Sequence, residues 1–449
     1  MSFYGKAYRR LIWPTYEALR GHKTPRLLAA AEARQWWPAE QLREFQWQEL
    51  LKLLRHAHDH CPWYRERWQT MGIDFQEIQT LTDFHKLPVV TKDDIYQHRN
   101  TMRASDVTDR VFEHRTGGST GQPLRFYINR ASYDWRLAVS LRGYTWAGCH
   151  DGDRQFYLWG QPIGTPPFSK RLKTKAHNAV LRRRVVSSFQ LNESKLADCL
   201  RQIKAFRPKT IVGYTNALYL LAQHTLNTQP LHHRPSAVIT AAEGVNAIQR
   251  ELIERAFRTP VFASYGSREF MLIAMECDQH RGLHLSADNL LVEVVRPDGS
   301  PAATGEVGEI LVTDLHNYAM PFIRYKIGDL GVLSNRTCPC GRGLPLLERV
   351  EGRVLDVIRT PDGRIVPGEF FPHLMKEFAV VRQFQIVQRA LDRLEIKLVL
   401  HAPSAPVELA RLEQEIRQIM GPSIQLEFQL LMEIPQTASG KFRVTISQL

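Results

Sequence analysis

A run of glycine and hydroxyl residues forms the first segment with chemical potential. Residues 116–121 read Thr-Gly-Gly-Ser-Thr-Gly, which places three glycines and three hydroxyls in six positions. Glycines let backbone N–H groups approach phosphate oxygens closely, and the hydroxyls add further donors. It is not a Walker A loop, because Gln122 and Pro123 follow in place of a Gly-Lys-Ser/Thr ending. The segment indicates a phosphate-binding loop, and a plain surface turn is the alternative.

Two further segments place carboxylates beside glycine turns and aromatic rings. Residues 264–269 read SYGSRE and directly follow a strand pattern. There, Glu269 offers an oxygen ligand of the kind that Mg²⁺ binds, and Tyr265 offers a face on which a base can stack. Residues 324–329 read RYKIGD, and Asp329 can accept hydrogen bonds from both hydroxyls of a ribose. The arginine of this segment adds a planar donor fork. Solvated side chains in turns are the alternative for both segments.

Two shorter segments complete the series. Residues 351–356 read EGRVLD, and residues 437–443 read TASGKFR. Each of the five segments alone is a weak signal of function. In this order and at these separations, however, they resemble the adenylate-forming superfamily of acyl-CoA synthetases, luciferases and peptide-synthetase adenylation domains. The resemblance covers about residues 110–443. The phrases LLRHAHDHCPWYRERW and MPFIRYKIGDLG make the chain most similar to the phenylacetate–CoA ligase family, including its relatives in polysaccharide gene clusters.

The resemblance implies an ATP site. Ser119, Thr120 and Gly121 would contact the β- and γ-phosphates, Tyr265 would lie beside adenine, and Asp329 would bind the ribose. The implied nucleotide-binding residues are Thr116, Gly117, Gly118, Ser119, Thr120, Gly121, Ala242, Glu243, Gly244, Tyr265, Gly266, Asp329 and Arg353.

The resemblance also implies the reaction. The carboxylate of an acid, by resemblance an aryl or arylacetic acid, attacks the α-phosphorus of ATP, so that acyl-AMP forms and pyrophosphate leaves. Glu269 would hold Mg²⁺, and Lys441 would bridge the carboxylate and the α-phosphate, because negative charge gathers on the phosphoryl oxygens. The thiol of CoA would then take the acyl group. No protein nucleophile is needed, and no catalytic triad pattern is present in the sequence.

Three positions differ from the family pattern. Gln122 stands where lysine is frequent, Arg268 stands beside the metal carboxylate where a small residue is frequent, and Leu355 stands at the usual hinge aspartate. The change at Leu355 keeps open an alternative in which an amine or a sugar, and not CoA, accepts the acyl group. The aromatic stretch 133–157 and Tyr214 could line an aromatic pocket, with ordinary core packing as the alternative.

Three cysteines and a histidine suggest a second metal. Cys277, His284, Cys338 and Cys340 have the residue types of a closed tetrahedral structural Zn²⁺ site. Their spacing is not that of a zinc finger, so four reduced residues without metal are the alternative. Similar patterns in phenylacetate–CoA ligase relatives favour zinc, and His280 competes for the role of histidine ligand.

The sequence patterns for helices and strands around these residues predict an α/β protein. Residues 1–80 have helical spacing, and short β-branched runs then alternate with helical patterns as far as about residue 330. Beyond residue 351 a hairpin, strands and one helix form a small α+β module. We therefore expect a large domain over 1–351, with mixed sheets and helices, and a small α+β domain over 352–449. The resemblance implies that the first is the adenylation domain and that the second is a mobile lid.

Composition limits the class of protein. The chain has 449 residues, of which 43% are hydrophobic and 23% charged, which excludes a mainly disordered or collagen-like chain. No signal peptide or transmembrane segment is evident, so we expect a cytoplasmic protein with reduced cysteines. Two copies could pair as a homodimer.

The net charge of +13 should attract polyanions. Its densest stretch is 170–184, KRLKTKAHNAVLRRR, which would be a solvated face, a nucleic-acid surface or a cationic entrance for CoA. Nucleic acid is not expected, because no nucleic-acid-binding motif accompanies the stretch. A non-catalytic basic binding protein is the alternative of another class, and the joint presence of Glu269, Asp329 and Lys441 argues against it.

Overall fold

The computed structural model describes most of the chain in two compact units. The residues outside the description are 1–4, 6, 108–109, 117–123, 161–166, 190, 229, 352–357, 363, 367, 369, 376, 379, 402–405 and 435–443. Unit 1 comprises residues 1–114, 125–152 and 262–352. Unit 2 comprises residues 115–124, 153–261 and 353–449.

Unit 1 begins with a series of helices, as the sequence predicts. They are η1 Tyr8–Ile12, α2 Trp13–Leu19, α3 Thr24–Arg34, α4 Ala39–His60, α5 Pro62–Thr70, η2 Phe75–Glu77, α6 Leu81–Phe84 and α7 Lys92–His98. Their ends follow local chemistry. Pro62 occupies the first turn of α5, where its missing N–H costs nothing, and Thr80 with Asp83 and Thr91 with Asp94 form capping boxes. Strands β1 Val111–Arg115 and β2 Arg125–Asn129 pair, and α8 Arg130–Trp146 follows and packs against α3.

The remaining strands of unit 1 form an antiparallel array in the order β10-β11-β12-β13-β9-β8-β7. Their bounds are β7 Val261–Ser267, β8 Met271–Glu276, β9 Leu283–Leu285, β10 Leu290–Val295, β11 Val307–Asp314, β12 Tyr325–Ser334 and β13 Leu346–Glu351. Every residue of β10 is buried, and every residue of the strand except Glu293 is apolar.

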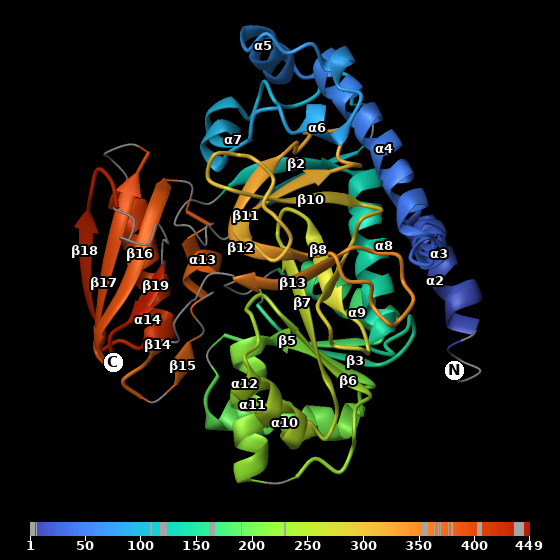
Figure 1. Cartoon of the computed structure of the whole chain (residues 1–449). Helices are drawn as coiled ribbons and strands as arrows, with labels where there is room; N and C mark the ends of the chain where they lie inside the picture. The colour runs from blue at the N-terminus through green and yellow to red at the C-terminus, as the bar shows by residue number, and fades with distance from the viewer. Residues whose placement is uncertain are drawn as a thin grey trace. The chain divides into compact units, whose positions relative to one another are not determined.

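The first part of unit 2 has the alternating pattern that predicts an α/β fold. Its strands pair in parallel in the order β4-β3-β5-β6, and helices connect them. Figure 1 shows α10, α11 and α12 gathered on one side of β3, β5 and β6. The elements are β3 Gln155–Trp159, α9 Phe168–Val180, β4 Arg183–Ser187, α10 Glu193–Phe206, β5 Thr210–Tyr214, α11 Thr215–Asn227, β6 Ala237–Ala241 and α12 Ala247–Phe257.

The C-terminal part of the chain, orange to red in Figure 1, carries its own four-stranded sheet in the order β18-β17-β16-β19. The predicted hairpin is present as the pair β14–β15. The bounds are β14 Ile358–Arg359, β15 Ile365–Val366, α13 Phe370–Met375, β16 Val381–Ala390, β17 Arg393–Leu400, α14 Pro406–Met420, β18 Gln425–Leu430 and β19 Thr445–Ser447. Buried Phe384, Ile396 and Leu412 contribute to its core.

The α/β fold class with a small α+β C-terminal module is thereby confirmed. The predicted domain boundary at 351 and 352 stays a prediction, because residues 352–357 lie outside the described part. Among the helices that the structure describes, none combines the length and the apolar character that crossing a membrane requires.

Candidate functional site

The loop predicted to bind phosphate is described only at its two ends. Thr116 is buried, its backbone N–H donates to the carbonyl of Leu124 at 2.9 Å, and its Oγ1 accepts from the backbone N–H of Leu124, also at 2.9 Å. These two bonds close the base of the loop. Gly117, Gly118, Ser119, Thr120 and Gly121 lie outside the described residues, so their contacts with phosphate stay a prediction.

Two of the residues predicted to bind the nucleoside, Tyr265 and Asp329, meet in unit 1. Tyr265 comes from β7 and Asp329 from β12, two strands that are not neighbours in the sheet. The hydroxyl of Tyr265 nevertheless donates a hydrogen bond to Oδ2 of Asp329 at 2.9 Å. Both side chains are partly exposed, so a carboxylate and an aromatic ring are presented together at one accessible place.

Glu269 is placed by a tight turn between β7 and β8. The carboxylate is 5% exposed, and the hydroxyl of Tyr325 donates to its Oε1 at 3.3 Å. Gly266 is required in the turn, because a Cβ at that position would lie 2.1 Å from the carbonyl oxygen of Met271. Arg268, the unusual neighbour of this carboxylate, is exposed to solvent. The buried carboxylate of Glu269 is therefore directly preceded in the chain by the solvated cation of Arg268.

The charge of Arg268 nevertheless affects the pKa of a histidine in unit 1. Burial, and then the charges of Arg136 and Arg268, lower the pKa of His114 to about 4. His114 on β1 is therefore neutral at physiological pH.

Glu243 belongs to unit 2 and is fixed by the start of α11. Its Oε2 accepts from the backbone N–H of Asn216 and its Oε1 from the side-chain amide of Asn216, both at 2.8 Å. Burial raises the pKa of this carboxyl to about 7, and the two bonds from Asn216 oppose that rise. Ala242 before it adopts a φ of 70°, which turns the chain sharply at the end of β6. The sequence singled out Glu243 but not Asn216, which no motif marks.

Arg324 does not offer the free donor fork that its residue type suggested. It is buried, its Nε donates to Oε1 of Glu293 at 3.1 Å, and its Nη1 donates to the carbonyls of His85 and Leu87. Arg324 therefore ties β12 to β10 and to the segment after α6, where it supports the strand that carries Asp329. Arg353 and Lys441, predicted from the same resemblance, lie outside the described residues.

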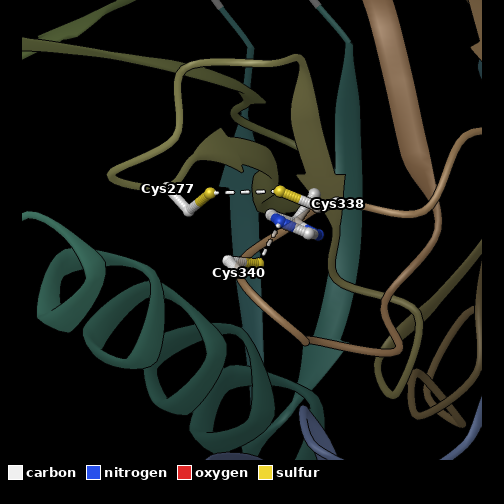
Figure 2. Close-up of side chains that lie close together, drawn as sticks. Cys277, Cys338 and Cys340 are labelled. Carbon is white, nitrogen blue, oxygen red and sulfur yellow. Dashed lines mark hydrogen bonds between the residues drawn. The ribbon is translucent and has the colours of Figure 1, made fainter.

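The four predicted zinc ligands come together in unit 1. Sγ of Cys277 lies 3.6 Å from Sγ of Cys338, and Sγ of Cys340 lies 3.2 Å from Nε2 of His284 (Figure 2). All four ligand atoms lie within 4.8 Å of one another. Residues about 60 positions apart in the chain therefore converge on one point, as a tetrahedral metal ion would require.

The surroundings of the cluster suit a metal. The other ring nitrogen of His284, Nδ1, lies 3.3 Å from the carbonyl oxygen of Leu344, the arrangement that directs Nε2 of a ligating histidine toward a metal. Burial lowers the pKa of His284 to about 4, so the ring is neutral. The pKa of the Cys340 thiol is lowered overall. Burial alone would raise this pKa, but hydrogen bonds from the backbone N–H and the guanidinium of Arg342 lower it. His280 pairs with Glu276 at 3.2 Å and is not part of the cluster.

A second group of metal-type ligands, which the sequence did not single out, lies at the end of α4. Nε2 of His60 is 3.4 Å from Oδ2 of Asp106, and Nδ1 of His56 is 3.8 Å from the same oxygen. The side chains of His60 and Asp106 are 38% and 41% exposed. This open arrangement is that of a surface histidine–carboxylate pair, in contrast to the buried cysteine–histidine cluster.

Comparison with known proteins relates the whole chain to one group. A family model for the CapK C-terminal domain matches residues 358–448. Protein CapK of Staphylococcus aureus is 25% identical over 422 residues, which cover 91% of this chain and 90% of the relative. The phenylacetate-coenzyme A ligase of Thermus thermophilus is 26% identical over 376 residues, which cover 82% of this chain and 83% of the relative.

The fold also has solved relatives. A crystal structure of 2-hydroxyisobutyryl-CoA ligase in complex with 2-HIB-AMP and CoA matches with a TM-score of 0.61 and 21% identity. The match covers 92% of each chain. Over most of its length the chain is therefore similar to phenylacetate-coenzyme A ligases and to CapK, as the sequence motifs predict, and it shares its fold with a solved CoA ligase.

Proposed function

We propose that the chain activates a carboxylic acid with ATP to acyl-AMP and then transfers the acyl group to the thiol of CoA. The observation that carries this proposal is the hydrogen bond between Tyr265 and Asp329, together with the buried carboxylate of Glu269 in the turn after β7. The names of the relatives support it, since several are phenylacetate-coenzyme A ligases and the solved relative is a CoA ligase bound to an acyl adenylate and CoA.

The residues divide the work as follows. Asp329 accepts hydrogen bonds from the ribose hydroxyls, and Tyr265 holds that carboxylate and flanks the base. The acid's oxygen attacks the α-phosphorus, the bond to the β-phosphate oxygen breaks, and pyrophosphate leaves with its electron pair. Glu269 would hold Mg²⁺, which supplies charge neutralisation at the phosphates, and Lys441 would stabilise the charge on the α-phosphate. In the second step the CoA sulfur attacks the acyl carbon and AMP leaves.

For the acid, we propose an aryl or arylacetic compound. Trp159 and Tyr214 lie with ring centroids 4.8 Å apart at the ends of neighbouring parallel strands. Gly160 follows, where a Cβ would lie 2.7 Å from Oη of Tyr214 and 2.8 Å from Phe189. Ligands of parallel sheets bind at the carboxyl ends of the strands, where Trp159 and Tyr214 lie, and the ring of Tyr214 is itself buried in the core of unit 2.

The aromatic residues of α8 serve a different purpose. The ring of Trp135 stacks on His316 with centroids 4.4 Å apart, and Trp146 contacts His284 of the cysteine–histidine cluster. We therefore assign these two rings to the core of unit 1 and not to the acid site.

Pyrophosphate release tests the proposal. The full chain is incubated with ATP and Mg²⁺ against aryl, arylacetic, fatty and amino acids, each with and without CoA. We expect release that depends on one acid class and that is lost in Lys441→Ala and in Glu269→Gln. Lys397→Ala, which changes a lysine on β17 paired with Glu395, is the matched control. ATP binding without release from any acid, by folded protein, would contradict turnover of this kind.

One observation favours an acyl acceptor other than CoA. The C-terminal residues 358–448 match the CapK C-terminal domain, and Leu355 replaces the usual hinge aspartate just before them. In this alternative the acyl-AMP is passed to an amine or a sugar. Acyl-CoA formed when CoA is present would support the first proposal. Acyl-AMP that is trapped by hydroxylamine but never gives acyl-CoA would support the second.

We also propose that Cys277, His284, Cys338 and Cys340 bind one structural Zn²⁺. The convergence of three sulfurs and one imidazole nitrogen within 4.8 Å supports this assignment. A site with four protein ligands leaves no position for substrate, so the ion would join the loops after β8 and before β13 and would take no part in the reaction.

A further inference from the structure

Helix α9 (Phe168–Val180) is a surface helix without a buried side. None of its 13 residues is buried. Phe168 is 79% exposed and Leu172 is 59% exposed. A surface helix of a globular protein normally directs its apolar stripe toward the core. On the first three turns of α9 the apolar residues instead face solvent.

The exposed apolar residues of α9 form one stripe. Phe168, Leu172 and Ala176 are spaced by four residues and so lie above one another on the same face of the helix, where Ala179 extends the row. Ala176 and Ala179 are exposed as well. His177, Asn178 and Val180 are partly buried, whereas every residue from Phe168 to Ala176 is exposed, so the accessible part is the N-terminal part of the helix.

Basic residues border this stripe on both sides. At about 100° per residue, Arg171 and Lys175 flank one edge of the stripe, and Lys170 and Lys173 lie beyond the other edge. All four are exposed. No aspartate or glutamate occurs anywhere from residue 154 to residue 192, so the sequence around the helix supplies no compensating negative charge. An apolar strip between cationic borders is the pattern of a helix that lies in a membrane interface.

We propose that α9 docks the protein onto an anionic phospholipid surface. Phe168 and Leu172 enter the boundary between headgroups and acyl chains, while the four flanking cations contact lipid phosphates. Nucleic acid fits less well, because a phosphate backbone would engage the cations but leave the apolar stripe in water. This peripheral attachment is separate from the chemistry proposed above and does not depend on it.

Vesicle flotation tests the proposal with the full chain. The probes are vesicles of phosphatidylcholine alone and of phosphatidylcholine with phosphatidylglycerol, each at low and high salt. We expect binding to the anionic vesicles, weakening with salt, and little binding to the neutral ones. The partition coefficient should fall about tenfold or more in two variants. The first is Phe168→Ser/Leu172→Ser, which leaves the net charge unchanged, and the second is Lys170→Gln/Arg171→Gln/Lys173→Gln/Lys175→Gln.

A matched control separates the helix from the net charge. Arg26→Gln/Arg43→Gln/Arg255→Gln/Arg281→Gln removes the same charge from exposed positions outside α9 and should retain most of the binding. Melting temperatures show that each variant is folded. Equal loss in the control, or full binding by Phe168→Ser/Leu172→Ser, would overturn the proposal. If vesicle binding survives in the α9 quadruple variant, and duplex DNA or CoA binding is lost in its place, the basic residues belong to that ligand.

Discussion

The hydroxyl of Tyr265 and the carboxylate of Asp329 are 2.9 Å apart, although 64 residues separate them in the chain. The bond joins β7 to β12, so the aromatic ring and the carboxylate that we propose as the ribose acceptor are held in one fixed relation. Such preorganisation lowers the cost of binding, because neither side chain must be ordered by the ligand.

Removing the charge of Asp329 tests this relation. Asp329→Asn keeps the shape of the side chain but loses an acceptor whose hydrogen bonds are charge-assisted, and such bonds contribute about 1.5–3 kcal/mol. We expect kcat/KM for ATP to fall by about 10–100-fold, since about 1.4 kcal/mol is tenfold. Tyr265→Phe removes one neutral partner only and should have a smaller effect. Unchanged ATP kinetics in Asp329→Asn, in a protein with an unchanged melting temperature, would remove Asp329 from the nucleotide site.

Zinc content and thermal stability test the cysteine–histidine cluster. Cys277→Ser should abolish bound zinc, measured by elemental analysis, and lower the melting temperature. A chelator should lower the melting temperature of the unchanged protein but not of the variant, because binding of an ion to the folded state stabilises it. Cys199→Ser is the control, since Cys199 is a buried free cysteine in α10 outside the cluster. Zinc retained by Cys277→Ser would contradict the four-ligand assignment.

Substitution of Gly266 tests the turn that presents Glu269. A Cβ there would lie 2.1 Å from the carbonyl of Met271, so backbone must move to accept Gly266→Ala. We expect a loss of about 1–3 kcal/mol in the free energy of unfolding, measured with urea. Gly244→Ala is the comparison, because nothing lies within 4 Å of the position that a methyl group would take at Gly244. Equal stability of the two variants would show that the turn relaxes without cost.

Glu243 predicts a pH dependence of stability. Its pKa is about 7 in the folded chain, above the ordinary value of about 4.3 expected when unfolded. Between these values the folded state holds a proton that the unfolded state has lost, so stability should fall as pH rises from about 4.5 to 7. Above pH 7 this proton-linked contribution is gone.

The comparison of wild type with Glu243→Gln isolates this effect. Glu293 has a pKa of about 7 for the same reason, burial, so the wild-type profile alone would mix the two groups. The difference in unfolding free energy between wild type and Glu243→Gln should change by about 2 kcal/mol across pH 5 to 7.5. A flat difference would mean that Glu243 is solvated and ionised throughout this range.

Local sequence patterns are enough to predict the class of element. The strand pattern at β10, the hairpin at β14–β15 and the helical spacing of the first 80 residues follow from local sequence, which needs no tertiary information. The order of the five motifs resembles that of the adenylate-forming superfamily, and the similarity of the chain to phenylacetate-coenzyme A ligases agrees with that resemblance.

Only the folded chain decides which residues of these motifs come into contact. Motif reading could not separate Asp329, which is accessible to a ligand, from Arg324, five positions earlier, which is bonded to Glu293 and two carbonyls. Motif reading chose His284 with His280 as a rival, and the fold brings His284 and not His280 to the cysteines. It could not find Asn216 as the partner of Glu243. These outcomes depend on strand pairings and turns that bring distant residues within hydrogen-bond range, and such long-range contacts leave no periodic trace in the chain.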